Sequence, residues 1–308
     1  MSEQRSKYIP ALLTILRTRT DCDHPLKYEA ILEILKAEYG LTPTRKTVAN
    51  NIATLCNMGF PLEYQHGWYY EHEFCPAELN LLIDSVLSAS QITEAQRSEM
   101  VDKLRHLGGE HFVPNFESCQ AKLVNHTFLL NLELLHAAIS GQQQVSFHYA
   151  DFGMDKQLHY RLNDRKRPKV YKINPYRIVT ANGRYYLICN VDKYDSLCHF
   201  RVERILDVKV LKAKAKPLSR MKDLDGPMDI QTYMAQHPFM YTGKPGKYLI
   251  RVKKQWLNEV FDTFGMGIEL SNDTGETFDA LVQSDAVSID FWLKKYAGDA
   301  ELVEEQKN

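Results

Sequence analysis

Two arginines near the middle of the chain carry the side chains best suited to binding a charged ligand. Arg201 and Arg204 close a stretch of short apolar segments and turns that covers residues 173–205. Guanidinium groups form forked, charge-assisted hydrogen bonds with phosphate or carboxylate, so the pair predicts a site for an anionic ligand. Residues three apart on an ideal strand face opposite sides, so both arginines face one ligand only if the strand ends or bulges near Val202. The alternative is that one arginine pairs with a nearby acid and only holds the fold together.

Tyrosines in the same region complete the candidate ligand site, since an aromatic ring stacks on a base and a phenol donates a hydrogen bond. Taken singly, such tyrosines are more often part of a core. The basic run 165–169 is interpreted either as a solvated loop or as a contact to a nucleic-acid backbone. The residues predicted to bind the ligand are Tyr149, Tyr176, Tyr185, Arg201 and Arg204.

A second set of polar side chains lies on a helix predicted over residues 43–57. Its buried stripe is Val48, Ile52 and Leu55, spaced four and three residues apart. Arginine and lysine reach phosphates or guanine edges, and asparagine pairs with adenine in the major groove. The alternative is that these side chains form only the solvated face of an amphipathic helix. The residues predicted to contact DNA are Arg45, Lys46, Thr47, Asn50 and Asn51, with His66 in a turn that follows the helix.

The elements around this helix are also predicted by the sequence. Helices are expected over 8–17 and 27–39, and Thr42 followed by Pro43 is expected to begin the third helix. Strands over 60–64 and 68–73 are expected to pair across a short turn. Three helices followed by a β-hairpin resemble a winged helix-turn-helix domain.

The middle of the chain predicts a small antiparallel β-barrel. Asn182-Gly183 is a strong hairpin signal, because both residues tolerate the positive φ of a tight turn. Residues 144–211 resemble the WYL domain, a family named for a Trp-Tyr-Leu tripeptide that appears here as 185–187, with tyrosine in place of tryptophan. Further matches are the segments 145–149, 175–176 and 200–205. The resemblance implies an Sm/SH3-like barrel and ligand sensing inside bacterial transcription regulators.

Charge is spread unevenly along the 308 residues. The formal net charge is −1, yet residues 153–222 hold 18 Lys and Arg against 6 Asp and Glu. The first 75 residues hold 8 basic and 9 acidic residues, so the predicted DNA reader is not basic overall. Because nonspecific DNA affinity comes mainly from neutralised phosphates, such a reader needs a local patch, a dimer or help from the basic middle.

Catalysis finds little support in the sequence. Cys198 and His199 are neighbours on a predicted strand, so they point apart and do not form a nucleophile–base pair. The 11 histidines show no paired metal-ligand spacing, and GxSxG, HExxH and GxGxxG motifs are absent from the sequence. We therefore predict no enzyme, no catalytic residue, no cofactor and no metal.

Composition predicts a cytoplasmic protein. No apolar run approaches the length of a membrane span, and the first residues lack the apolar core of a signal peptide. Six cysteines without paired spacing fit reduced thiols that serve packing. They are Cys22, Cys56, Cys75, Cys119, Cys189 and Cys198.

Together these features predict an α+β multidomain chain. The expected parts are a winged helix-turn-helix domain over 1–75, a helical linker and dimerisation region over 76–142, a WYL ligand-sensing domain over 143–213, a linker over 214–245 and a small α+β extension over 246–308. The expected function is a homodimeric transcription regulator whose affinity for a double-stranded operator is modulated by a nucleotide or oligonucleotide. The alternative is that the basic middle is itself a nucleic-acid-binding module, with the N-terminal domain used for protein contacts.

Overall fold

The computed structural model of the chain describes residues 2–89, 91–113, 126–224 and 226–306. Contacts divide the chain into two compact units, residues 1–122 and 123–308. Cys119 lies outside the described residues. Among the helices that are described, none combines the length and apolar character that crossing a bilayer requires.

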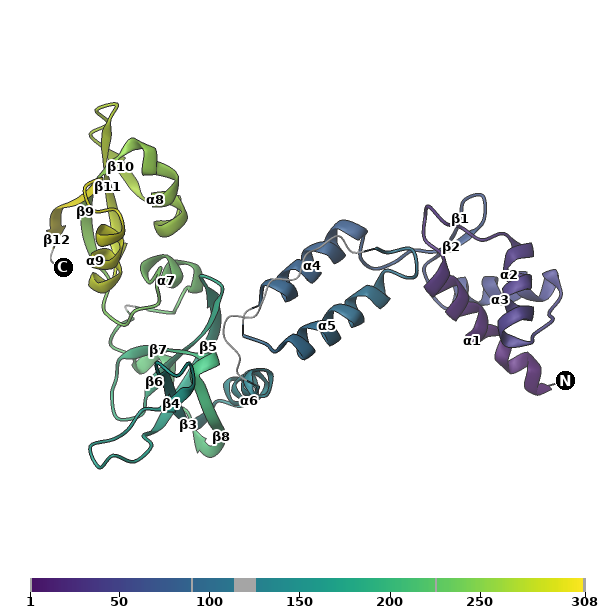
Figure 1. The fold of residues 1–308 in the computed structure, drawn as a ribbon, viewed down its shortest axis with the longest axis horizontal. Coiled ribbons are helices and arrows are strands. Elements are labelled where there is room, and N and C mark those ends of the chain that lie inside the picture. The colour runs from purple at the N-terminus through teal and green to yellow at the C-terminus, as the bar shows by residue number, and fades with distance from the viewer. Residues whose placement is uncertain (1, 90, 114–125, 225, 307–308) are drawn as a thin grey trace. The chain divides into compact units, whose positions relative to one another are not determined.

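The first unit begins with three helices and a two-stranded antiparallel hairpin, in the predicted order (Figure 1). Leu12, Ile15 and Leu16 of the first helix pack against the buried stripes of the other two helices in one apolar core. Val48, Ile52 and Leu55 are all buried, as their spacing predicts. These elements are α1 (Ser2–Arg19), α2 (Tyr28–Tyr39), α3 (Arg45–Asn57), β1 (Leu62–Tyr64) and β2 (Trp68–Tyr70).

The third helix begins two residues later than its sequence signal indicates. Its N-cap is Thr44, whose side chain accepts a hydrogen bond from the backbone N–H of Thr47 at 3.2 Å. The expected start at Thr42 and Pro43 is therefore wrong. Thr44 is the N-cap because its hydroxyl reaches a backbone N–H that would otherwise lack a partner in the first turn.

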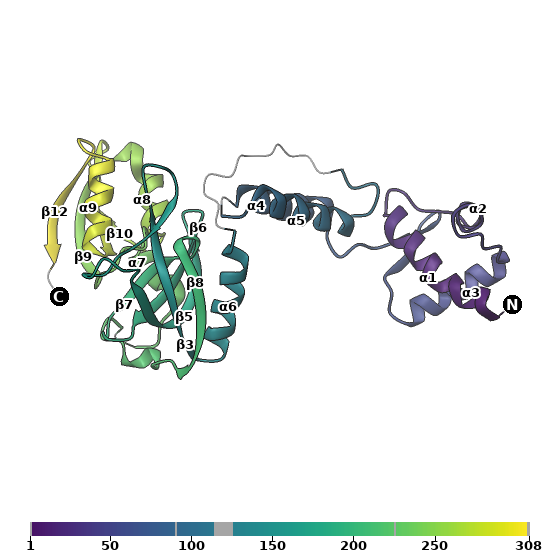
Figure 2. The same ribbon diagram turned by 60° about the horizontal axis from the view of Figure 1, so that its bottom comes forward.

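Two further helices, α4 (Pro76–Ser88) and α5 (Glu94–Leu107), pack on each other in the same unit (Figure 2). Both lie in the region for which the sequence predicts a helical linker. Thr93 begins α5 with a capping box: its side chain accepts from the backbone N–H of Gln96, whose own side chain accepts from the backbone of Thr93. Ile83 and Val101 are buried between the two helices.

The second unit begins with α6, which packs on an antiparallel sheet (Figure 2). The Asn131 side chain of this helix donates to the carbonyl of Ile205 at 2.8 Å. The helix thus joins the strands that follow it, although the sequence analysis groups it with the preceding linker. These elements are α6 (Phe128–Ser140), β3 (Gln143–Phe152), β4 (Leu158–Tyr160), β5 (Val170–Ala181), β6 (Arg184–Val191), β7 (Leu197–Arg201) and β8 (Ile205–Lys214).

The sheet does not close into the expected barrel among the described strands. Its order is β4-β3-β5-β6-β7, with β8 paired to β3. β7 pairs with β6, and the chain then passes through a 3-10 turn, Val202–Arg204, into β8 on the other side of β3. The two consecutive strands therefore stay unpaired with each other. The predicted turn at Asn182-Gly183 is present, with φ of 50° and 67°.

The C-terminal part of this unit is a four-stranded antiparallel sheet in the order β10-β11-β9-β12, preceded by a short helix. Two helices cover one face, where Val260 and Trp292 pack on Ile250 and Ala280. The last strand was missed by the sequence analysis because it is acidic, exposed and bulged after Leu302. These elements are α7 (Ile230–Gln236), β9 (Gly246–Lys253), α8 (Leu257–Phe264), β10 (Glu269–Ser271), β11 (Thr277–Ser284), α9 (Ala286–Lys295) and β12 (Ala300–Gln306).

Candidate functional site

The face of α3 opposite its buried stripe presents polar side chains to solvent within the first unit. Arg45, Lys46 and Asn50 are exposed, while Thr47 and Asn51 are half-buried. The Arg45 guanidinium lies 5.0 Å from the centre of the Tyr28 ring, and 3.8 Å separates it from the carboxylate of Glu29, itself exposed. Exposed ion pairs of this kind are weak, so Arg45 can exchange its partner for a phosphate.

His66 lies exposed in the turn between β1 and β2, with φ of 60°. The turn is fixed by the neighbouring Trp68, which exchanges two backbone hydrogen bonds with Leu26, 2.8 and 2.9 Å long. A Cβ on Gly67 would lie 2.9 Å from the backbone of Leu26, so only glycine fits there. The hairpin tip that carries His66 is therefore held against the loop before α2.

In the second unit, the ring of Tyr149 on β3 lies close to two guanidinium groups. The centre of its ring is 4.9 Å from Arg161 and 4.9 Å from Arg204. Asp151, two residues along the same strand, bonds both arginines: Arg161 bidentately at 2.6 and 3.2 Å, and Arg204 through its Nη2. Arg204 Nε also donates to the carbonyl of Ala150 at 2.9 Å. One carboxylate therefore bridges two cations over a tyrosine ring.

Arg201 reaches the same tyrosine through its backbone, since its N–H donates to the Tyr149 hydroxyl at 3.2 Å. Its side chain pairs with Glu203, whose carboxylate accepts from Arg201 Nε at 2.8 Å and lies 2.6 Å from Nη2. Glu203 is buried, with 2% of its side chain exposed. The strand ends at Arg201 and turns through a 3-10 helix, which is the break that the three-residue spacing of Arg201 and Arg204 requires.

The structure brings three of the five predicted ligand residues together: Tyr149, Arg201 and Arg204. Tyr176 lies in a different apolar cluster, where its hydroxyl donates to the sulfur of Met221. Tyr185 packs edge to face on Phe128 of α6.

Arg161 and Asp151 were missed by the sequence analysis. They meet because β4 pairs antiparallel with the end of β3, which places Asp151 opposite His159 and brings Arg161 past the strand end. The backbone N–H of Arg161 donates to the carbonyl of Tyr149 at 2.8 Å. The signal that could have found them is a hairpin around Gly153, with the two residues of opposite charge on its arms.

The surroundings of Tyr149 have opposite effects on the pKa of its phenol. Burial raises the pKa of the Tyr149 phenol, while the positive charge of Arg204 and the backbone hydrogen bond from Arg201 act to lower it. The raised value keeps the phenol neutral at physiological pH, so its hydroxyl remains both a donor and an acceptor. The positive charge of the site therefore comes from the arginines alone.

The basic run 165–169 is exposed along its whole length. Asn163 shapes this loop by accepting backbone hydrogen bonds from Arg165 and Arg167 at 3.0 and 3.1 Å. The backbone N–H of Lys169 donates to the carbonyl of Arg161, so the loop is continuous with the arginine cluster. A basic surface next to the cluster fits a polyanion better than a small carboxylate.

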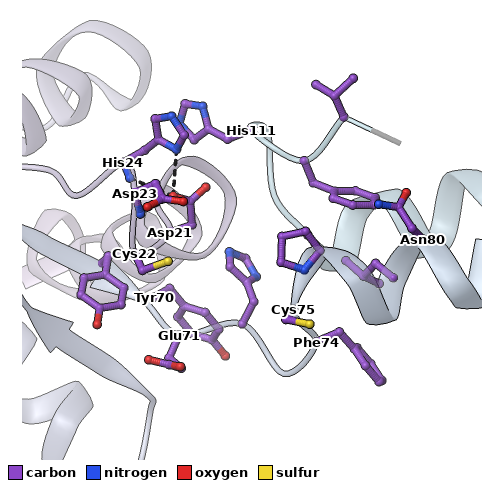
Figure 3. Close-up of a pocket in the computed structure, with 17 residues that line it drawn as sticks. Asp21, Cys22, Asp23, His24, Tyr70, Glu71, Phe74, Cys75, Asn80 and His111 are labelled. Atoms are coloured by element: carbon purple, nitrogen blue, oxygen red, sulfur yellow. Dashed lines mark hydrogen bonds and ion pairs between the residues drawn. The ribbon is translucent and has the colours of Figure 1, made fainter. Parts of the chain in front are cut away.

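A cavity of about 410 Å³ lies inside the first unit, where the loop before α2, the end of β2 and the loop after α5 meet (Figure 3). The rings of His24 and His111 stack there with centres 3.9 Å apart, and the His24 ring nitrogen lies 2.8 Å from an Asp21 oxygen. As far as the structure describes it, the lining holds no lysine or arginine. No group of three or more His, Cys, Asp or Glu among the described residues is arranged to hold a metal. This cavity was not predicted from the sequence, because its walls come from loops, a strand end and a helix start that are separate in the sequence.

Comparison with known proteins identifies the central part of the second unit. The family model of the WYL domain matches residues 131–210, from α6 to β8. The chain contains a WYL domain. No curated protein matches the chain. Proteasome accessory factor B/C (PafBC) of Arthrobacter aurescens aligns with 97% of this chain at 12% identity and a TM-score of 0.30, and this chain spans 45% of its length.

Proposed function

We propose that this protein is a DNA-binding transcription regulator, with α3 as the recognition helix of a winged helix-turn-helix domain. The observation that carries the proposal is the exposed face of α3. Lys46 and Asn50 are exposed to solvent, and the opposite face of the same helix is buried in the core. Lysine suits phosphates and guanine, and asparagine suits adenine, in the major groove. His66 at the hairpin tip takes the place of the wing, on the DNA backbone.

The near-neutral charge of the first 75 residues supports a dimer as the binding form. A single N-terminal domain with little net charge neutralises few DNA phosphates, so its affinity for DNA is low. When the two N-terminal domains of a dimer bind one DNA molecule, the overall affinity for DNA rises, because the second contact becomes intramolecular. A homodimer on a two-fold operator is therefore part of the proposal.

The WYL domain is proposed to bind an anionic effector at the arginine cluster of Tyr149, Arg161 and Arg204. Asp151 is the group that the anion replaces, because 47% of its side chain is exposed and it bonds both cations. A phosphate offers more acceptor oxygens than a carboxylate and so spans both guanidiniums. Arg201 contributes to the cluster mainly by holding the turn that places Arg204.

The proposed effector is a nucleotide or an oligonucleotide, since the exposed loop 165–169 continues the positive surface beyond the cluster. Tyr149 is buried and the centre of its ring lies close to both guanidiniums, and so it orients them instead of stacking on a base. Effector binding changes operator affinity only if it favours one of two conformations of the protein.

The experiment is a selection of bound duplexes from a random pool by the full chain, followed by titration of the best duplex with and without a short oligonucleotide. We expect the selected duplex to bind at least about 10³-fold more tightly than unrelated sequence, the lower end for specific DNA readers. We expect the oligonucleotide to change that affinity. Equal binding of all duplexes would remove the assignment of a reader.

A second candidate function has one observation in its favour, the exposed and contiguous basic run 165–169. In that case the WYL domain itself is the main nucleic-acid contact, and the N-terminal unit serves protein contacts. Substitutions in the run and on α3 separate the two functions.

A further inference from the structure

Two cysteines face each other across neighbouring strands of the WYL domain. Cys189 of β6 lies directly opposite Cys198 of β7 in the strand register. Their sulfur atoms are 3.7 Å apart, and the Cys189 thiol is also 3.7 Å from the carbonyl oxygen of Cys198. Neither is part of the arginine cluster or of the face of α3. The sequence analysis assigned both to packing.

The backbone at this position already suits a disulfide. Residues directly opposite on antiparallel strands have Cα atoms about 4.5 or 5.5 Å apart, depending on the hydrogen-bonding type of the pair. Both values fall within the range of about 4.4–6.8 Å found across disulfides. Rotation of the two side chains is therefore enough to bring the sulfur atoms into bonding distance, and the strands need not move apart.

The two thiols differ in exposure. Cys189 is fully buried, with 0% of its surface exposed, whereas Cys198 is half-buried. The hydrogen bond from Cys189 lowers the pKa of the Cys198 thiol, and burial raises the pKa of the Cys189 thiol. A more acidic, partly exposed thiol beside a second, buried one is the arrangement in which the first reacts with an oxidant and the second resolves the product.

We propose that Cys189 and Cys198 form a reversible redox modification site that a hydroperoxide converts to a disulfide. The Cys198 thiolate attacks one peroxide oxygen, the O–O bond breaks, and the leaving oxygen takes up a proton as an alcohol or water. Cys198 is then a sulfenic acid. Cys189 attacks its sulfur, the S–S bond forms, the S–O bond breaks, and the hydroxide leaves as water with the Cys189 proton. Two thiols are oxidised and one peroxide is reduced.

The site lies on the strand that positions Arg201, three residues after Cys198. A covalent bond between β6 and β7 fixes the end of β7 from which the 3-10 turn starts. The inference does not depend on the proposed function, because oxidation of the two thiols is measured directly, without DNA or an effector.

The experiment treats the reduced full-length chain with increasing hydrogen peroxide, alkylates the remaining thiols and maps tryptic peptides by mass. Cleavage after Arg184, Lys193 and Arg201 places Cys189 and Cys198 on separate peptides, so the disulfide appears as a cross-link. We expect this cross-link to form, with loss of two alkylatable thiols, before the exposed Cys22 and Cys75 are modified. Dithiothreitol should restore both thiols.

Single variants test the order of the steps. Cys189→Ala should trap Cys198 as a sulfenic acid that dimedone labels, whereas Cys198→Ala should leave Cys189 unlabelled. Cys22→Ala is the matched control and should form the cross-link as the unaltered chain does. The proposal is overturned if Cys189 and Cys198 stay alkylatable in the unaltered chain while Cys22 or Cys75 is oxidised. Labelling of Cys189 in the Cys198→Ala chain would overturn the assigned roles.

Discussion

At the scale of single residues, the exposure of its acid partner determines whether each arginine can exchange that partner for an anionic ligand. Arg204 shares Asp151, a half-exposed carboxylate that water can solvate once it is displaced. Arg201 pairs with Glu203, whose carboxylate is buried. If an anion displaced Glu203, this carboxylate would lose its ion pair with Arg201 where water does not reach it. Removing one member of a buried ion pair leaves an uncompensated charge, whereas displacing an exposed acid costs little. The two arginines therefore have different roles, although the sequence presents them as equivalents.

Arg204→Ala should weaken effector binding and leave the fold intact. A charge-assisted hydrogen bond contributes roughly 1.5–3 kcal/mol, which corresponds to a loss of about 10- to 150-fold in affinity for an oligonucleotide. Isothermal titration of the chain with a short oligonucleotide measures it. Arg204→Lys is the matched control, because it keeps the charge and loses the fork, and it should recover only part of the affinity. Unchanged affinity in Arg204→Ala would exclude this arginine from the site.

Arg201→Ala should lower the free energy of unfolding by about 3 kcal/mol, because the buried carboxylate of Glu203 loses its ion pair with the guanidinium. Urea denaturation measures the loss. Adding Glu203→Gln in the same chain should return part of that stability. If Arg201→Ala unfolds at the same urea concentration as the unaltered protein, the pair does not hold the turn.

On α3, Asn50→Ala and Lys46→Ala should have distinct effects on DNA binding. Loss of a base contact by Asn50 should cost about 1–3 kcal/mol and relax the sequence preference at one position. Loss of a phosphate contact by Lys46 should weaken binding to all sequences and reduce the salt slope by about one. Fluorescence anisotropy on the selected duplex and its single-base variants measures both. Lys103→Ala on α5, an exposed lysine of the same unit, is the control and should bind as the unaltered chain does.

Local patterns predicted much of the site and missed its pairings. A ligand shared by Arg201 and Arg204 required the strand to end or bulge near Val202, and the 3-10 turn supplies this break. The contact of Asp151 with Arg204 depends on the pairing of β3 with β8, which join residues far apart in the sequence. Spacing rules carry no information about such long-range pairs, so Asp151 could not be assigned as the partner of Arg204.

At the scale of elements, local capping rules and long-range packing compete to set where each element begins. For α3 the sequence offers two threonines, and the structure uses the second. For the central sheet, turn chemistry placed the β5–β6 hairpin correctly, because Asn182 and Gly183 take the positive φ values such a turn needs. The closure of the sheet depends on whether β7 and β8 pair, which turn signals do not report. The element order was therefore predictable, and the barrel was not.

Thr44→Ala should lower the stability of the first unit by about 1 kcal/mol, since an N-cap hydrogen bond is lost at the start of α3. Thr42→Ala is the matched control, because Thr42 is exposed and lies outside the helix, and it should change stability little. Thermal unfolding of the full chain, followed at the transition of the first unit, compares them. The opposite ranking would restore Thr42 as the cap.

β7 and α7 are joined by a half-buried histidine, His199, which predicts a pH effect. His199 Nε2 lies 2.8 Å from the Tyr233 hydroxyl, and burial, followed by the nearby His237, lowers the pKa of His199 to about 4. An unfolded histidine titrates near 6.5, so below that pH the unfolded chain binds a proton that the folded chain does not. Stability should therefore be constant above about pH 7 and fall as the pH drops toward 4.

Between pH 7 and pH 5 the expected loss from His199 is on the order of 1–2 kcal/mol of unfolding free energy. Urea denaturation at both pH values measures it, with His199→Gln as the variant that removes the titration. The variant should show a smaller loss between the two pH values. An equal loss in both proteins would show that other groups cause it.

At the scale of the whole molecule, charge is separated between the parts that the proposal assigns to reading and to sensing. The N-terminal 75 residues are nearly neutral, while residues 153–222 hold 18 basic against 6 acidic residues. Specific DNA reading relies on base contacts and on a second head, so it tolerates a neutral surface. In the proposal, effector capture relies on the positive field of the WYL domain, which attracts anions over a Debye length of about 8 Å in physiological salt.

The measurement that tests the account most directly compares two substituted chains on the selected duplex. One carries Lys46→Ala with Asn50→Ala on α3, and the other carries Arg165→Ala with Lys166→Ala in the exposed loop of the WYL domain. Both lose side chains that could contact nucleic acid, in different units of the molecule. If α3 reads DNA, the first chain loses at least about tenfold in operator affinity while the second keeps the sequence preference of the unaltered protein. If the first chain binds the duplex as tightly as the unaltered protein and the second does not, the N-terminal unit is not the reader.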